Sequence, residues 1–312
     1  MKVLFTADLH IKLGQKNVPI DFQINRYRVL FSKLASIECD LLVLGGDVFD
    51  RVPTMPELGL YFEMLEAIKD TRTIIYPGNH EAVKKNTTFL SNLSLVTLAA
   101  TDSNVRIIDD FLTIDNMDFI PYNRLKEPWP DFSGNICFTH VRGEIPPHVK
   151  PEIDLSLLDR WTLVLAGDLH SHSNSQRNIV YPGSPLTTSF HRNEVDSGII
   201  MLDSESLQWE FNSLGLPQLL RKTVSSPEEM IPSNYHHTIY EIEGDVGSLT
   251  NIKNSELLDK KIIKREQKSK LNLVDLTLEE ELKMYLKEVL NIGNVEEVVK
   301  EANDYIKDAE LE

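Results

Sequence analysis

The stretch DLLVLGGDVFD at residues 40–50 places an apolar run directly before two glycines and two aspartates. A short apolar run that ends in turn residues predicts a buried strand, and glycines let the backbone turn sharply where the strand ends. A carboxylate at that turn can bridge two cations, which makes Asp47 the candidate shared metal ligand. Asp50 is expected to orient a neighbouring group or to cap a turn. The stretch predicts a strand that delivers aspartates to one edge of a sheet.

Two other strand-like runs end in the same way. KVLFTADLH at residues 2–10 ends in Asp8 and His10, which are two apart on an extended backbone and so point in one direction. TIIYPGNHE at residues 73–81 ends in Asn79, an amide ligand, with His80 beside it. Open α/β sheets bind ligands beyond the carboxyl ends of their strands. We therefore expect the three clusters to converge on one site.

Two histidine clusters follow later in the chain. His140 closes the run at residues 136–138, and Asp168, His170 and His172 follow the run at residues 162–165. Imidazole, carboxylate and amide oxygen together suit manganese, iron or zinc. Two adjacent divalent ions suit displacement at phosphorus, because they activate water and stabilise charge on both reacting oxygens. The pattern implies a pair of catalytic metals.

The alternation of short strands with amphipathic helices predicts an α/β fold. Helices are expected over residues 25–37 and 57–68, where apolar residues recur every three or four positions. Strands are expected at residues 2–6, 40–44, 73–76, 105–108, 136–138, 162–165 and 198–202. The composition shifts after Leu214, which predicts three parts: a main domain at residues 1–214, a small α+β capping domain at 215–276 and a helix–turn–helix tail at 277–312.

Charge is unevenly distributed along the chain. The 312 residues carry 32 basic and 48 acidic side chains, a net charge of −16, which by itself argues against binding a polyanion. Residues 271–312 hold 12 of the acidic and 4 of the basic residues, whereas residues 253–270 hold 7 basic and 3 acidic ones. We expect this basic segment to face DNA phosphates through Lys260, Lys261, Lys264 and Arg265. A solvated surface face remains the alternative.

The motifs Asp8-Leu-His10, Gly46-Asp47-Val-Phe-Asp50 and Gly78-Asn79-His80-Glu81 resemble those of the calcineurin-like metallophosphoesterases. Within that superfamily, YPGSPLTTSF at residues 181–190 is similar to a segment of SbcD-type double-strand-break repair nucleases. The length and helical end also resemble recombination nuclease subunits of tailed phages. The resemblance implies a layered sandwich of two sheets flanked by helices, with a small capping domain and a helical tail.

The resemblance also implies ligand sets. One metal would be held by Asp8, His10, Asp47 and a histidine of the last motif. The second would be held by Asp47, Asn79, His140 and another group of that motif. His80 would not bind metal, but would stabilise the scissile phosphate or protonate the leaving oxygen. The expected ions are two Mn²⁺, with Mg²⁺, Fe²⁺ or Zn²⁺ as alternatives.

The last motif departs from the family pattern Gly-His-x-His. The chain has Asp168 where the first histidine is expected, and His172 follows His170 by two positions. If the glycine register is kept, Asp168 and His170 are the ligands; if the histidine pair is kept, His170 and His172 are. The glycine register is favoured because Gly183 then follows the motif by 13 residues rather than 11.

The resemblance implies a DNA nuclease subunit that acts in recombination or repair as a 3′-to-5′ exonuclease on duplex ends and an endonuclease on single strands. Its partners would be double- and single-stranded DNA and an SbcC-type SMC-like ATPase bound through the tail, with a homodimer inside a heterotetramer. The alternatives are a phosphomonoesterase or cyclic-nucleotide phosphodiesterase with the same ions, and an assembly subunit with a degenerate site. Without a signal peptide or a long apolar run, the expected location is the cytoplasm, that of the host for a phage protein.

Overall fold

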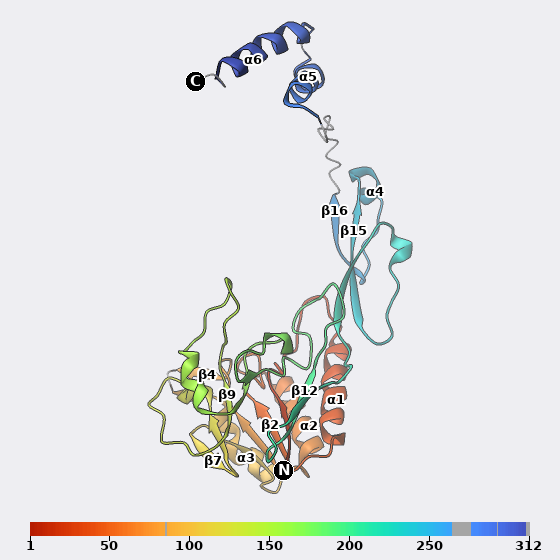
Figure 1. Cartoon of the computed structure of the whole chain (residues 1–312). Helices are drawn as coiled ribbons and strands as arrows, with labels where there is room; N and C mark the ends of the chain where they lie inside the picture. Colours follow the sequence, from red (N-terminus) through yellow and green to blue (C-terminus); the bar gives the residue numbers. More distant parts are fainter. Residues whose placement is uncertain (85, 264–275, 292, 310–312) are drawn as a thin grey trace. The chain divides into compact units, whose positions relative to one another are not determined.

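The computed structural model describes residues 1–84, 86–263, 276–291 and 293–309 (Figure 1). The chain forms two compact units. The first comprises Met1–Glu243 with Leu249–Ile262, and the second comprises Gly244–Ser248 with Ile263–Glu312. The three-part division expected from the sequence stays a prediction.

The first unit is built around a six-stranded sheet that carries three of the predicted polar clusters. Strands β1, β2, β3 and β6 run parallel, and β12 and β13 continue the sheet antiparallel beyond β1. Because β1, β2 and β3 are adjacent and parallel, their carboxyl ends meet at one edge. The strands are β1 Lys2–Thr6, β2 Leu41–Gly45, β3 Thr73–Tyr76, β6 Val105–Ile107, β12 Gly198–Asp203 and β13 Trp209–Ser213.

A five-stranded sheet in the order β11-β10-β9-β8-β7 supplies the two histidine clusters. Strands β8, β9, β10 and β11 run parallel to one another, and β7 pairs antiparallel with β8. The carboxyl ends of β9 and β10 are His140 and Gly167, paired with each other in register. The strands are β7 Leu112–Ile114, β8 Met117–Ile120, β9 Ile136–His140, β10 Leu163–Gly167 and β11 Ile179–Val180.

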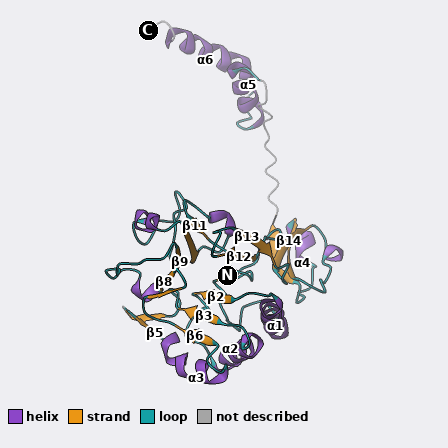
Figure 2. Ribbon diagram, turned by 60° about the horizontal axis from the view of Figure 1, so that its bottom comes forward, coloured by secondary structure: helices purple, strands orange, loops and turns teal. Residues whose placement is uncertain are grey.

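Apolar side chains join these sheets into a layered sandwich. One core lies between the sheets, where Phe5 and Phe138 meet edge to face at 5.5 Å. On the outer face of the six-stranded sheet, helices α1 (Ile20–Ser36) and α2 (Met55–Ile68) bury apolar stripes. Figure 2 shows α1, α2 and α3 (Ser94–Ala100) on one side of this sheet and β8, β9 and β11 on the other. The sandwich predicted from the sequence is confirmed.

The remaining strands form two small sheets. The hairpin of β4 (Ala82–Lys84) and β5 (Thr87–Thr88) follows the third polar cluster directly. A three-stranded sheet is made of β14 (Leu219–Val224), β15 (His237–Gly244) and β16 (Leu258–Ile263). Its β15 contacts the start of the main domain, because His237 Nε2 lies 2.6 Å from the Asn17 carbonyl oxygen. The short helix α4 covers Val246–Thr250.

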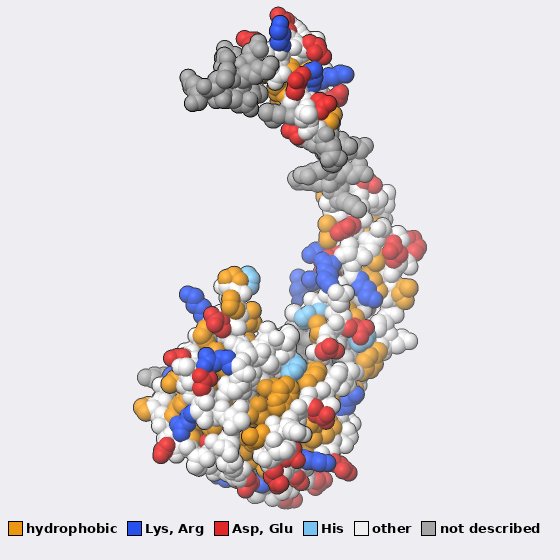
Figure 3. Space-filling model, in the orientation of Figure 1, with side chains coloured by type: hydrophobic (Ala, Val, Ile, Leu, Met, Phe, Trp, Pro, Cys, Tyr) orange, Lys and Arg blue, Asp and Glu red, His pale blue; other side chains and the backbone are white. Residues whose placement is uncertain are grey.

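The second unit contains the two tail helices, α5 (Leu278–Glu288) and α6 (Val295–Ala309). Thr277 caps α5 with a capping box, in which its side chain and that of Glu280 exchange hydrogen bonds with each other's backbone. Leu286 and Val299 are buried, whereas Tyr285 and Leu290 are 44% and 50% exposed. Figure 3 shows charged side chains with apolar ones between them over the described part of these helices. Two helices therefore lie where the sequence predicts a helical tail.

No helix of the described residues is long and apolar enough to cross a bilayer.

Candidate metal centre

The five predicted clusters meet at the shared edge of the two sheets. Beyond the ends of β1 and β2 the two loops run side by side, because the backbone N–H groups of Asp8 and His10 donate to the carbonyls of Gly46 and Asp47 at 3.0 and 2.9 Å. Asp8, His10, Asp47 and Asp168 all have positive φ angles of 46–97°. Non-glycine residues adopt this conformation at a cost, and such strain is concentrated at functional sites.

Two glycines allow the loops to approach this closely. Gly46 has a φ of +88°, and a Cβ on it would lie 2.5 Å from His140 Nδ1. A Cβ on Gly78 would lie 2.5 Å from the Asp47 backbone nitrogen. Both positions therefore require glycine for space, and Gly46 also requires it for its backbone conformation.

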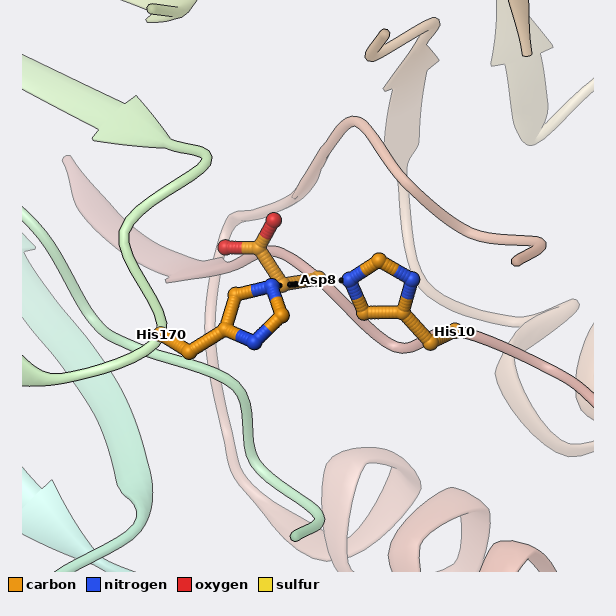
Figure 4. Close-up of side chains that lie close together, drawn as sticks. All are labelled: Asp8, His10 and His170. Carbon is orange, nitrogen blue, oxygen red and sulfur yellow. Dashed lines mark hydrogen bonds between the residues drawn. The ribbon is translucent and has the colours of Figure 1, made fainter. Parts of the chain in front are cut away.

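One half of the centre gathers Asp8, His10, Asp47 and His170. The ring nitrogens Nε2 of His10 and His170 are 3.0 Å apart, and Figure 4 shows these nitrogens pointing at each other with the Asp8 carboxylate beside them. His10 Nε2 is 3.8 Å from Asp47 Oδ2. Asp8, His10 and His170 each offer a ligand atom within 4.8 Å of the others. This is one of the two ligand sets implied by the resemblance.

The other half gathers Asp47, Asn79, His140 and Asp168 around one point. The Asn79 side-chain oxygen lies 2.9 Å from His140 Nε2, and 3.2 Å from both Asp47 Oδ2 and Asp168 Oδ1. His140 Nε2 is 3.5 Å from Asp47 Oδ2. The atoms that converge here carry lone pairs, so a cation bound between them would satisfy all of them with the Asn79 side-chain amide in its present orientation. The donor chemistry of both halves fits divalent metal ions.

The two remaining candidates of the centre lie beside these ligands. His80 is 38% exposed; its Nδ1 donates to the Asp50 carbonyl at 2.6 Å, and its Nε2 faces Asp47 Oδ2 at 3.8 Å. The Asp50 carboxylate pairs with Lys12 Nζ at 2.7 Å and lies 3.7 Å from His10 Nδ1. Asp50 therefore contacts both histidines from outside the cluster.

His172 lies apart from the metal centre. Its ring stacks on Phe211 at 4.5 Å, and its Nδ1 donates to the Tyr181 carbonyl at 2.7 Å. Asp168, by contrast, lies at the metal centre, because its backbone N–H donates to Asp8 Oδ1 at 3.1 Å. The structure brings Asp168, rather than His172, to the other candidate ligands.

The basic segment is only partly described. Lys260 Nζ pairs with Glu241 Oε1 at 2.7 Å, and Lys261 Nζ donates to the Ile252 carbonyl at 2.6 Å. Lys264 and Arg265 lie outside the described residues. Contact of these four side chains with DNA stays a prediction.

Two functional candidates escaped the sequence analysis. Glu81 is fully buried and accepts the backbone N–H groups of Asp47, Phe49 and Gly78 at 2.8–3.0 Å, which holds two ligand loops together. Arg142 donates from Nε and Nη2 to Asp168 at 3.0 and 3.2 Å. Glu81 was visible as a carboxylate beside the Asn-His pair, and Arg142 as a cation two positions after His140.

Burial and mutual charge shift the acid–base equilibria of the centre. Burial, helped by the Asp47 charge, raises the pKa of Asp8 to about 8. Burial opposes protonation of His140, but the nearby Asp47 carboxylate prevails and raises the pKa of His140 to about 10. Burial lowers the pKa of His10 to about 3, which leaves it a neutral imidazole suited to bind metal. The metal-free protein thus holds two protons that a cation would replace.

These pKa values predict how the stability of the metal-free protein depends on pH. Folded Asp8 keeps its proton up to about pH 8 and folded His140 up to about pH 10, whereas the unfolded chain has lost both protons above about pH 7, so the free energy of unfolding falls as pH rises from 7 to 10. Thermal unfolding in a chelator should show a falling midpoint across this range. With Mn²⁺ present, affinity should instead rise with pH because binding expels the protons. A flat midpoint in the chelator would contradict the assignment.

Comparisons with known proteins place this geometry in context. Residues 1–196 match the family described as calcineurin-like phosphoesterase. The chain is 43% identical to the probable exonuclease subunit 1 of Escherichia phage T5, over 99% of both chains. It is 28% identical to the putative phosphoesterase 244L of Invertebrate iridescent virus 6, over 64% of this chain and 75% of that protein. The solved nuclease MPE of Pseudomonas putida is 13% identical with a TM-score of 0.33, over 67% of this chain and 87% of that one.

Proposed function

The chain belongs to the calcineurin-like phosphoesterase family, and we propose that it is the nuclease subunit of a DNA recombination or repair complex. The observation that carries the proposal is the convergence of five strand ends on one set of metal-ligating side chains. Full-length similarity to a phage protein named as an exonuclease subunit supports DNA as the substrate. The proposed reaction is hydrolysis of phosphodiester bonds, as a 3′-to-5′ exonuclease on duplex ends and an endonuclease on single strands.

The proposed ligands follow from the two halves of the centre. Asp8, His10, Asp47 and His170 would hold one ion, and Asp47, Asn79, His140 and Asp168 the other. When bound, two divalent ions supply activation of water and neutralise charge on the phosphoryl oxygens. We propose Mn²⁺, because the carboxylate of Asp168 replaces a softer imidazole and favours a harder ion.

The chain's own residues would position and protonate the substrate. His80 donates through Nδ1 to the Asp50 carbonyl, which fixes the ring and leaves Nε2 facing the centre. Its backbone N–H donates to Asp47 Oδ1 at 2.9 Å, so the loop of His80 is tied to the shared ligand. A proton held at Nε2 can pass to the leaving oxygen as the phosphorus–oxygen bond breaks. Glu81 keeps these loops in register.

A substrate comparison tests the proposed reaction. Purified protein with Mn²⁺ is expected to shorten a 5′-labelled linear duplex from its 3′ ends and to cut circular single-stranded DNA. It should leave a nucleoside monophosphate and a cyclic nucleotide untouched, because the first has no phosphodiester bond and the second holds its diester within a small ring. Rapid hydrolysis of either small compound without cleavage of DNA would point to a phosphomonoesterase or a cyclic-nucleotide phosphodiesterase of the same fold.

We further propose that the tail binds an SbcC-type ATPase, in a heterotetramer that contains a homodimer of this chain. The support is a set of exposed apolar residues on α5, directly after it and on α6: Tyr285, Val289, Leu290 and Val298 are 37–50% exposed. The name of the phage relative, an exonuclease subunit, also implies an assembly. Because that relative is phage-encoded, we propose the host cytoplasm as the place of action.

A double substitution tests the tail. Changing Tyr285 and Leu290 to aspartate is expected to abolish co-purification with the co-expressed ATPase, since two charges would enter an apolar contact. The control is Ile231→Asp, which alters a side chain that is 67% exposed in the first unit. Unchanged recovery of the ATPase with the double variant would refute the docking role.

A further inference from the structure

A hollow of about 340 Å³ lies next to the metal centre. Its lining comes from the β4–β5 hairpin and from the segment after β8, and includes Ala82, Val83, Lys84, Tyr122, Asn123 and Lys126. The volume falls in the ~300–1,000 Å³ range of small-molecule sites. None of the residues implied as metal ligands lines it, so it is a separate feature of the surface.

The course of the chain and two contacts of Tyr122 join the hollow to the centre. Its first wall, β4, begins two positions after His80 in the chain. Tyr122 also lines the hollow, and its backbone N–H donates to the Pro77 carbonyl at 3.2 Å, in the loop that carries Asn79. The Tyr122 ring lies 6.1 Å from the His140 ring, edge to face. A strand whose phosphate sat at the centre would thus have its neighbouring nucleotide within reach of the hollow.

The charges around the hollow leave its lysines available. Lys84 and Lys126 form no ion pair with any described residue, and none of the lining residues is acidic. The nearby carboxylates are engaged: Glu127 is bonded by Arg124 at 2.9 Å and by Asn86, and Glu152 accepts from the Tyr122 hydroxyl at 3.1 Å. In a chain of net charge −16, two cations that pair with no acidic side chain in the described part of the chain, both on one apolar hollow, indicate an anionic ligand.

We propose that this hollow binds the nucleotide next to the phosphodiester bond being cut, as part of a single DNA strand. Ala82, Val83 and the Tyr122 ring supply apolar and aromatic surface for a base, and Lys84 and Lys126 supply cations for the flanking phosphates. Sites that bind single strands without sequence preference combine these two elements, aromatic stacking and positive charge. The inference rests on the proposed nuclease function and assigns a substrate-positioning subsite to it.

The test measures binding to a fluorescent oligothymidylate in a chelator, where hydrolysis cannot contribute. The double variant Lys84→Ala, Lys126→Ala is expected to reduce the slope of log affinity against log salt by about 1.4, for two lost phosphate contacts at ~0.7 each. Tyr122→Ala is expected to weaken binding by about 5- to 100-fold through lost stacking, and Tyr122→Phe should retain most of it.

The matched control is Lys2→Ala, Lys69→Ala, which removes the same charge at the amino end of β1 and just past the end of α2. Equal losses in the two double variants, or a wild-type salt slope after the Lys84 and Lys126 changes, would overturn the subsite. Circular dichroism melting would show that each variant folds. Failure of the wild-type protein to cut DNA would count against the nuclease function instead, because binding is measured separately.

Discussion

Replacing His80 with glutamine is expected to lower kcat for DNA cleavage by about 10²–10⁴-fold while two metal ions stay bound. The imidazole is placed for proton transfer because its Nδ1 bond to the Asp50 carbonyl aims Nε2 at the centre. Glutamine lacks a group that exchanges a proton near neutral pH, so the leaving oxygen would depart unprotonated. Elemental analysis measures how many metal ions stay bound, and single-turnover cleavage in Mn²⁺ measures the rate of the chemical step.

The leaving group provides a sharper readout for His80. The nitrophenyl ester of thymidine 5′-monophosphate is a phosphodiester whose leaving group, nitrophenolate, departs as a stable anion without protonation, so His80→Gln should lose far less activity on this ester than on DNA. An equal loss on both substrates would show that His80 acts by another route. The geometry also allows His80 to bind metal, since His10, Asp47 and His80 offer ligand atoms within 4.8 Å of one another. Loss of one ion in the variant would establish that role and remove the proton-transfer assignment.

Replacing Asp168 with asparagine is expected to weaken binding of one Mn²⁺ by on the order of 100-fold or more. This exceeds the ~10–100-fold cost of losing a group that merely supports a ligand. Asparagine matches aspartate in size and tolerates the positive φ of 97° at this position, so the change removes charge and leaves the backbone intact. Calorimetric titration with Mn²⁺ of the chelator-treated protein measures the stoichiometry and affinity directly. DNA cleavage should fall with the lost ion.

The matched variant is His172→Phe. Phenylalanine preserves the stacking on Phe211 at 4.5 Å but cannot ligate, so both ions should bind as in the wild-type protein. If His172→Phe lost an ion and Asp168→Asn retained both, the register of the last motif would be the opposite of the one proposed.

Strand positions were predictable because each strand is an apolar run bounded by turn residues. The expected strands at residues 2–6 and 73–76 coincide with β1 and β3. The strands expected at 136–138 and 162–165 end two residues later in the structure, at His140 and Gly167. The sequence analysis missed β8, Met117–Ile120, although it is buried throughout. Asp118 interrupts the apolar run of this strand, which hides the strand in the sequence. The Asp118 carboxylate can be buried because Thr113, Gly134 and Trp161 donate hydrogen bonds to it.

The residue types and their spacing established that strand ends carry carboxylate, amide and imidazole groups, and parallel strand order made their convergence expected. Folding alone decided which member of the last motif reaches the centre, since the left-handed backbone of Asp168 and the stacking of His172 on Phe211 depend on segments far away in the chain. Folding alone likewise decided that Glu81 ties two loops together, and that Tyr122 and Lys126 face the hairpin after His80. Local sequence fixes how a backbone segment prefers to run, whereas side-chain partners are chosen by packing between segments with no proximity in the chain.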